Sequence, residues 1–377
     1  MTSGDDISAA KPIKLPGQIV LVMQGGGAQG AYQAGVYQAL HEVGIEPDWV
    51  IGTSIGAING SIIAGNAVAR RLERLREFWS HVESPPPGLL GMIAPMFGSP
   101  ATDLATLLNG VPGFFSPNAA VLKGFEAPVG VERAALYSVD PLKEFLPELV
   151  DFERLNSGDP RFTLGLVGVP DSQMRYFDSF YGKIALDHVL GSSAVPPTFP
   201  AVRIDGKAYW DGGIYSNTPV EAVFDDVPRQ SSVIFAVQIW HTRGPEPQSV
   251  AQVFARQKDI MFGSRSKSQL AQQVELHRMR HTVRTLVNML PEEQRNTPEV
   301  QDLARYGCTS VMHLVEINAE PLEGETNSRE YDFTRATIEA RWQAGYADTC
   351  RMIAKRPWEN KIDPSVGVAV YASDAFS

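Results

Sequence analysis

Cysteine is nearly absent from the 377-residue chain, which contains only Cys308 and Cys350. Two cysteines cannot build a disulfide framework, and neither belongs to a CxxC or similar pair, so the sequence predicts no zinc site. Positive charge is also scarce, because 33 Lys and Arg residues stand against 43 Asp and Glu residues and the formal net charge is −10. Dedicated nucleic-acid-binding domains are usually basic, so this balance argues against a nucleic-acid partner.

Long hydrophobic runs are missing as well, and no apolar run approaches the roughly 18 residues that a membrane-spanning helix requires. Residues 1–17 are polar and acidic and lack the apolar core of a secretory signal peptide, and we expect residues 1–16 to be a flexible leader. These features predict a cytoplasmic protein and leave peripheral membrane contact and homo-oligomerisation open. What the chain does have is 44% hydrophobic residues, which is ample for a buried core.

Two strand–helix units open the predicted globular part. The apolar run at 18–24 predicts a buried strand, and a helical pattern follows from Ala31. A second short strand is expected at 48–52, with a helix of small and apolar residues from Ile55. Such repeats predict right-handed βαβ connections and a parallel sheet, hence an α/β fold. Further strands are expected at 161–169, 174–179, 232–240 and 311–317, a hairpin at 202–210 around Asp205 and Gly206, and helices at 68–81, 184–193, 250–290 and 334–353.

A GxSxG pentapeptide joins the second strand to its helix. Small residues around its serine allow a sharp, strained turn that exposes the hydroxyl. The helix that follows directs its positive dipole end toward any negative charge that forms there. The pattern predicts that Ser54 is a nucleophile; the alternative is a serine that only caps the helix. The elbow consists of Gly52, Thr53, Ser54, Ile55 and Gly56.

A glycine loop lies one strand–helix unit upstream, at Gly25, Gly26 and Gly27. Backbone N–H groups in such a loop can stabilise the oxyanion of an acyl-transfer reaction, because no side chain blocks close approach. The same loop matches the dinucleotide pattern GxGxxG through Gly30. That reading needs an acidic residue at the end of the second strand, whereas Asp48 precedes the strand, so the sequence disfavours a nucleotide site.

The expected base for Ser54 is Asp211, which ends a strand-like segment. Gly212 and Gly213 follow it, so its carboxylate can approach another loop closely. His241 is the alternative, because it follows a strand and completes the order Ser–Asp–His of α/β-hydrolases. The elbow comes after only two strands, earlier than in those enzymes, which favours Asp211 as the base itself.

The stretches GGGAQG, GTSIG and DGGIYSNTP resemble, in order and approximate spacing, the motifs of bacterial patatin-like phospholipases. GSSAVPPTFP resembles the family's Ala/Ser-rich helix that ends in Pro and Phe. The resemblance covers about residues 17–240 and implies a catalytic domain built as a three-layer α/β/α sandwich with a central, mainly parallel sheet. It also implies a dyad of Ser54 and Asp211 without histidine and an oxyanion hole at Gly25–Gly27, with no cofactor and no metal.

The chain departs from that family at Gln29, where the glycine loop often has Arg or Lys. The missing cation predicts weaker contact with anionic head groups or a lower rate. Residues 84–120 are rich in Met, Phe, Pro and Gly and predict a lid for an acyl chain, with exposed Phe114 and Phe115; the alternative is an insertion packed on the core. Residues 241–377 predict a largely helical C-terminal region packed on the catalytic domain. Its basic stretch near 256–284 is interpreted as a solvated face rather than a lipid-binding one.

These features together predict a serine acyl-ester hydrolase of the phospholipase A or lysophospholipase kind, which acts through an acyl-enzyme on a lipid or long-chain acyl ester and releases a free fatty acid. The alternatives are a non-lipid esterase, a thioesterase or an intracellular polyester depolymerase with the same nucleophile. A non-catalytic lipid-binding protein is a further alternative.

Overall fold

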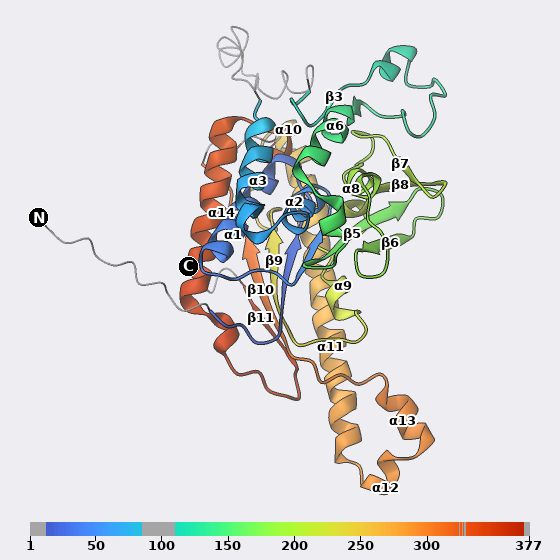
Figure 1. Cartoon of the computed structure of the whole chain (residues 1–377), viewed down its shortest axis with the longest axis vertical. Helices are drawn as coiled ribbons and strands as arrows, with labels where there is room; N and C mark the ends of the chain where they lie inside the picture. The colour runs from blue at the N-terminus through green and yellow to red at the C-terminus, as the bar shows by residue number, and fades with distance from the viewer. Residues whose placement is uncertain (1–12, 85–109, 324, 326, 328, 373–377) are drawn as a thin grey trace, which may run out of the picture.

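The computed structural model of the chain describes residues 13–84, 110–323, 325, 327 and 329–372 (Figure 1). Within these residues, nine strands form one central sheet in the order β11-β10-β9-β1-β2-β5-β8-β7, and β6 pairs with β5 outside that path. The parallel strands are β1 (Gln18–Met23), β2 (Trp49–Gly52), β5 (Arg161–Gly168), β9 (Ser232–Gln238), β10 (Met312–Asn318) and β11 (Val368–Tyr371). The antiparallel ones are β6 (Met174–Asp178), β7 (Val202–Ile204) and β8 (Lys207–Asp211), and a separate pair joins β3 (Ser116–Pro117) to β4 (Tyr137–Ser138).

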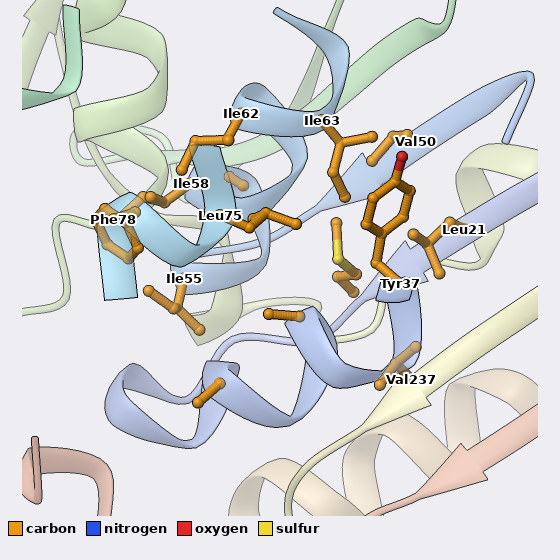
Figure 2. Close-up of a cluster of buried hydrophobic side chains, with 14 of the residues drawn as sticks. Leu21, Tyr37, Val50, Ile55, Ile58, Ile62, Ile63, Leu75, Phe78 and Val237 are labelled. Carbon is orange, nitrogen blue, oxygen red and sulfur yellow. The ribbon is translucent and has the colours of Figure 1, made fainter. Parts of the chain in front are cut away.

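Helices cover both faces of this sheet, as the continuous apolar runs in β1 and β9 require of strands buried on both sides. One face packs against α1 (Ala31–Glu42), α2 (Ile55–Ala64), α3 (Val68–His81) and α14 (Arg335–Lys355). Figure 2 shows part of this core, in which apolar side chains of α2 and α3 meet Leu21 and Val50 of the sheet. The other face packs against α9 (Glu221–Phe224) and α11 (Arg265–Met289). The predicted three-layer α/β/α arrangement is therefore confirmed.

The first helix, α1, and the C-terminal helix α14 pack against each other at two glycines, one on each helix. A Cβ atom at Gly35 of α1 would lie 1.9 Å from the carbonyl oxygen of Trp342 in α14, and a Cβ at Gly345 would lie 2.1 Å from that of Tyr32. Only glycine permits the two backbones to approach so closely. The C-terminal region is thus held tightly against the first helix of the chain.

Residues 241–377 are largely helical, as predicted, but they also complete the central sheet. The strand expected at 311–317 is β10, which pairs in parallel with β9, and β11 extends the sheet beyond it. The sequence prediction missed β11. The remaining helices of this region are α10 (Val250–Asp259), the π-helix η5 (Ile260–Ser264), α12 (Glu292–Arg295) and α13 (Pro298–Ala304), with the short turns η6 (Arg329–Tyr331) and η7 (Pro357–Glu359).

The predicted exposure of Phe114 and Phe115 is wrong. These side chains are 5% and 2% exposed and pack in an aromatic cluster whose ring partners include Phe78 and Phe199. Edge-to-face aromatic packing stabilises such a cluster beyond the area that it buries. This part of the segment follows the alternative of an insertion packed on the core. The rest of the predicted lid, at 85–109, lies outside the described residues.

The remaining helices before residue 241 are α6 (Asp140–Leu149), α7 (Phe152–Leu155) and α8 (Leu186–Ser192), with the short turns η1 (Gly27–Gly30), η3 (Ala119–Lys123) and η4 (Gly212–Ile214).

Candidate active site

Ser54 occupies a strained turn between β2 and α2. Its φ of 56° and ψ of −126° lie where residues other than glycine are rarely found. The flanking glycines are required by space, because a Cβ at Gly52 would lie 2.2 Å from the Gly56 carbonyl oxygen and one at Gly56 would lie 2.3 Å from that of Met23. The Ser54 side chain makes no capping hydrogen bond to α2. The hydroxyl is therefore free of the structural role that was the alternative to a nucleophile.

Ser54 and Asp211 meet because two strands converge along one edge of β5. The parallel strand β2 pairs Gly52 with Leu164, whereas the antiparallel strand β8 pairs Asp211 with Leu166. The opposite edge of β5 is occupied by β6. The ends of β2 and β8 therefore face each other only two residues of β5 apart, which brings the elbow serine and the aspartate together.

The GSSAVPPTFP stretch braces both residues from α8. The backbone N–H of Ser54 donates to the backbone oxygen of Ser192 at 3.0 Å and lies 3.2 Å from its Oγ. Two residues later, the Ala194 carbonyl accepts a hydrogen bond from the Asp211 N–H at 3.0 Å. Gly212 packs against β5, where a Cβ would lie 2.4 Å from the Gly165 carbonyl oxygen. Sequence motifs far apart in the chain thus fix one another's backbones.

The Asp211 carboxyl is buried, with 3% of the residue exposed. Burial raises the pKa of Asp211 to about 7, although the Gly213 N–H, 2.7 Å from Oδ1, and a hydrogen bond from the Ser54 side chain both favour the ionised form. Desolvation penalises the charged carboxylate more than these two donors stabilise it. A carboxyl group with a pKa near neutrality can accept and return a proton at physiological pH.

The glycine loop is clamped by Asn217, which belongs to the DGGIYSNTP stretch. The Gly25 N–H donates to Asn217 Oδ1 at 3.2 Å, and Asn217 Nδ2 donates to the Gly25 carbonyl at 3.0 Å. Trp240 Nε1 donates to the same carbonyl at 2.6 Å. The Gly25 amide is therefore engaged, whereas within the described part of the chain the amides of Gly26 and Gly27 donate to no other group.

A cavity of about 290 Å³ opens at Ser54 and Asp211. Gly25 and Asn217 also reach it, and Lys258 and Glu330 form an ion pair in its wall. Most of the remaining wall is apolar: it includes Val195, Pro196, Pro197, Ile214, Trp240, Met261 and Phe262. The arrangement places a hydroxyl and a buried carboxyl group in the wall of a largely apolar pocket.

Neither His241 nor Asp48 lines this cavity. The His241 ring hydrogen-bonds the Ala319 carbonyl at 3.0 Å, and its Nε2 lies 3.6 Å from the Glu325 carboxylate. Asp48 accepts a hydrogen bond from the Ile19 N–H at 2.8 Å, at the ends of β1 and β2 remote from the glycine loop. The structure therefore supports neither the histidine triad nor the dinucleotide alternative.

His277, His281 and Cys308 are the described residues whose ligand atoms lie close enough together to hold a metal ion, within 4.8 Å of one another. The Nε2 atoms of both histidines hydrogen-bond the Ser310 carbonyl, at 3.0 and 2.7 Å, which links α11 to the strand that follows. None of these side chains lines the cavity at Ser54. This group takes no part in the chemistry proposed below.

A family model described as "Patatin-like phospholipase" matches residues 21–224, more than half of the chain. The chain belongs to the patatin-like phospholipase family. A second model, DUF3734, described as "Patatin phospholipase", matches residues 260–365. The patatin-like match spans the elbow and the DGG motif, and the second model covers most of the C-terminal region.

Curated relatives match this patatin-like chain over short stretches. Lysophospholipase nte1 of Aspergillus terreus is 55% identical over 47 residues, which are 12% of this chain and 3% of that protein. Patatin-like phospholipase domain-containing protein 6 of Homo sapiens is 37% identical over 75 residues, which are 20% of this chain and 6% of that protein. The matched stretches thus span less than a tenth of these relatives' lengths.

The solved structures that match this chain have low TM-scores. VipD from Legionella pneumophila has a TM-score of 0.34 at 15% identity, over 88% of this chain and 67% of that chain. The ExoU–SpcU complex of Pseudomonas aeruginosa has a TM-score of 0.26 at 16% identity, over 76% and 59%. Within the described ranges, no helix combines the length and the apolar content that crossing a bilayer would take.

The part of the site that comes from the C-terminal region was not predicted from the sequence. Lys258, Met261, Phe262, Glu330 and Tyr331 all line the cavity of the patatin-like domain. Their only local signal is the apolar pair Met261–Phe262 within a long basic helix, and η5 places that pair at the cavity through a π-helical turn. Such turns often occur at functional sites.

Proposed function

We propose that the chain hydrolyses long-chain acyl esters, phospholipids or lysophospholipids foremost, with Ser54 as nucleophile and Asp211 as general base. The observation that carries this proposal is the buried Asp211 carboxyl, with its pKa of about 7, next to an elbow serine in an apolar cavity. Family membership supports the same class of substrate.

In the acylation step, the Asp211 carboxylate takes the proton of the Ser54 hydroxyl while Oγ attacks the ester carbonyl. The carbonyl oxygen becomes an oxyanion that the amides of Gly26 and Gly27 stabilise. The tetrahedral intermediate then expels the alcohol or lysolipid, which takes the proton from Asp211. An ester between Ser54 and the acyl chain remains.

In the deacylation step, Asp211 takes a proton from a water molecule that attacks the acyl-Ser54 carbonyl. The second tetrahedral intermediate collapses, Ser54 leaves with the proton that Asp211 returns, and the free fatty acid departs. The Gly25 amide serves a different purpose, because its bond to Asn217 holds the loop in place.

The test is hydrolysis of p-nitrophenyl esters of increasing chain length by the wild type, Ser54→Ala and Asp211→Asn. We expect both variants to lose at least about a thousandfold in kcat. Ser172→Ala is the matched control for Ser54→Ala, because Ser172 has the same positive φ of 56° and lies outside the cavity. Asp205→Asn is the control for loss of a carboxylate, because Asp205 also lies outside the cavity. Full activity of Ser54→Ala would contradict the proposal.

The chain-length profile separates the finer alternatives. A maximum with long chains, together with release of fatty acid from phospholipid vesicles, supports a lipid hydrolase. Activity confined to short esters, thioesters or hydroxyalkanoate oligomers would instead support an esterase, thioesterase or depolymerase with the same dyad. Labelling of Ser54 by a fluorophosphonate distinguishes all of these from a non-catalytic lipid-binding protein.

A further inference from the structure

The helix α10 and the π-helix η5 expose apolar side chains to solvent. On a helix with about 100° per residue, the five residues involved fall within an arc of about 120°, so they form one face. We call this face the α10 stripe. It consists of Val250, Val253, Phe254, Ile260 and Met261, which are 72%, 51%, 61%, 51% and 42% exposed.

The opposite face of α10 is anchored by a charged group. Asp259 is buried, forms an ion pair with Arg329 and accepts a hydrogen bond from the His241 N–H at 3.2 Å. A surface helix normally buries its apolar face and exposes its polar one. In α10 this orientation is reversed, because the charged Asp259 is buried and the apolar side chains of the stripe are exposed.

The α10 stripe leads directly into the catalytic cavity. Met261 belongs both to the stripe and to the wall of the cavity that holds Ser54. Ile214 also lines that cavity and is 37% exposed, and the neighbouring Tyr215 is 53% exposed. Exposed apolar side chains therefore belong both to the surface beside α10 and to the wall of the cavity that holds the nucleophile.

Cations lie beside the stripe in a chain whose net charge is −10. Arg256, at one edge of the stripe, donates to the carbonyls of His241 and Thr242, and Arg265 donates to the carbonyl of Ile214. Bonds to carbonyls do not neutralise a guanidinium charge, and among the residues that the structure describes neither group forms an ion pair. Each basic residue close to an anionic membrane surface raises the affinity by about fivefold.

We propose that the α10 stripe docks on an anionic lipid bilayer and holds the mouth of the Ser54 cavity at the boundary between head groups and acyl chains. Interfacial helices bind in this way, with the apolar face in the membrane and basic side chains at its edge. The proposal rests on the proposed function for the identity of the substrate, but docking itself requires no catalysis.

Cosedimentation of Ser54→Ala protein with vesicles tests the docking without turnover. Vesicles of phosphatidylcholine containing phosphatidylserine should bind the protein, and Phe254→Asp in that background should weaken binding by about tenfold or more. Leu303→Asp is the matched control: Leu303 is also 61% exposed, and it lies in α13 at the far end of the molecule from α10 (Figure 1). Equal binding by the Phe254→Asp protein and its parent would overturn the proposal.

Activity and self-association complete the test. With Ser54 intact, Phe254→Asp should hydrolyse a short soluble ester at the wild-type rate and lose activity only on vesicles. Wild-type protein that binds vesicles but hydrolyses no ester would remove the proposed function and leave the docking intact. A wild-type dimer in sedimentation velocity that Phe254→Asp dissociates would assign the stripe to a second copy of the chain and overturn the membrane proposal.

Discussion

The side chains of Gln29 and Arg329 bind each other across 300 residues of sequence, with Arg329 Nε donating to Gln29 Oε1 at 3.0 Å. The bond leaves Gln29 Nε2 to donate to the Gly26 carbonyl at 3.4 Å. Because the C=O and N–H of a trans peptide point in opposite directions, holding the Gly26 carbonyl also aims the Gly27 N–H. The cation that the glycine loop lacks at position 29 is thus present as Arg329, and it acts on the loop through Gln29.

Arg329→Met should lower kcat on a soluble short-chain ester by about tenfold, because a loosened donor stabilises the oxyanion less well. KM should change little, since the ester makes no contact with Arg329 in the proposed reaction. Steady-state kinetics alongside thermal melting separates this effect from simple destabilisation. The exchange variant Gln29→Arg with Arg329→Gln should recover part of the lost kcat; an exchange variant as slow as Arg329→Met would argue against the pairing.

The pH profile of kcat/KM should rise with an apparent pKa of about 7 and then stay level, because Asp211 accepts a proton only when it is ionised. A carboxyl group with its ordinary pKa would instead give a profile that is level from about pH 5 upward. The measurement is hydrolysis of a soluble ester whose leaving group does not titrate in this range. A profile without a step near neutrality would show that Asp211 is not the base.

Asp211→Asn should stabilise the fold at alkaline pH. The native pKa of Asp211, about 7, lies above its value in an unfolded chain, about 4, so between these values the native state binds the extra proton. The wild type therefore loses stability as the pH rises from about 4 to 7. The amide does not titrate, so chemical denaturation at pH 5 and pH 8 should give a larger gain for Asp211→Asn at pH 8. An equal gain at both values would contradict the raised pKa.

Gly35→Ala and Gly345→Ala should each lower the free energy of unfolding by about 1–3 kcal/mol, because a methyl group would force α1 and α14 apart. The same change at Gly182, where a Cβ would meet nothing within 4 Å, is the control and should stay within about 0.5 kcal/mol. Urea denaturation of the three variants gives the comparison. If Gly35→Ala were as stable as Gly182→Ala, the C-terminal helix would not depend on this close contact.

Much of the fold follows from local patterns of apolar residues and glycines in the sequence. The strands at 18–24 and 48–52 are short apolar runs, the first followed by Gly25 and the second ending in Gly52, so their type and position were predictable. β11 was not, because four residues gain their strand structure only by pairing with β10. The burial of Phe114 and Phe115 was likewise hidden, since it depends on aromatic partners elsewhere in the chain.

By itself, the sequence determined the elbow at Ser54, the glycine loop and the DGG turn. Each of these motifs is a short stretch in which small residues set the local backbone conformation, so each can be recognised without knowledge of the rest of the chain. Only the tertiary structure decided which groups act on one another. The convergence of β2 and β8 on one edge of β5 joins Ser54 to Asp211. The clamp of Asn217 occupies the Gly25 amide, and the C-terminal region supplies Arg329 and part of the cavity wall. Contacts of this kind depend on long-range packing, to which no single stretch of sequence points.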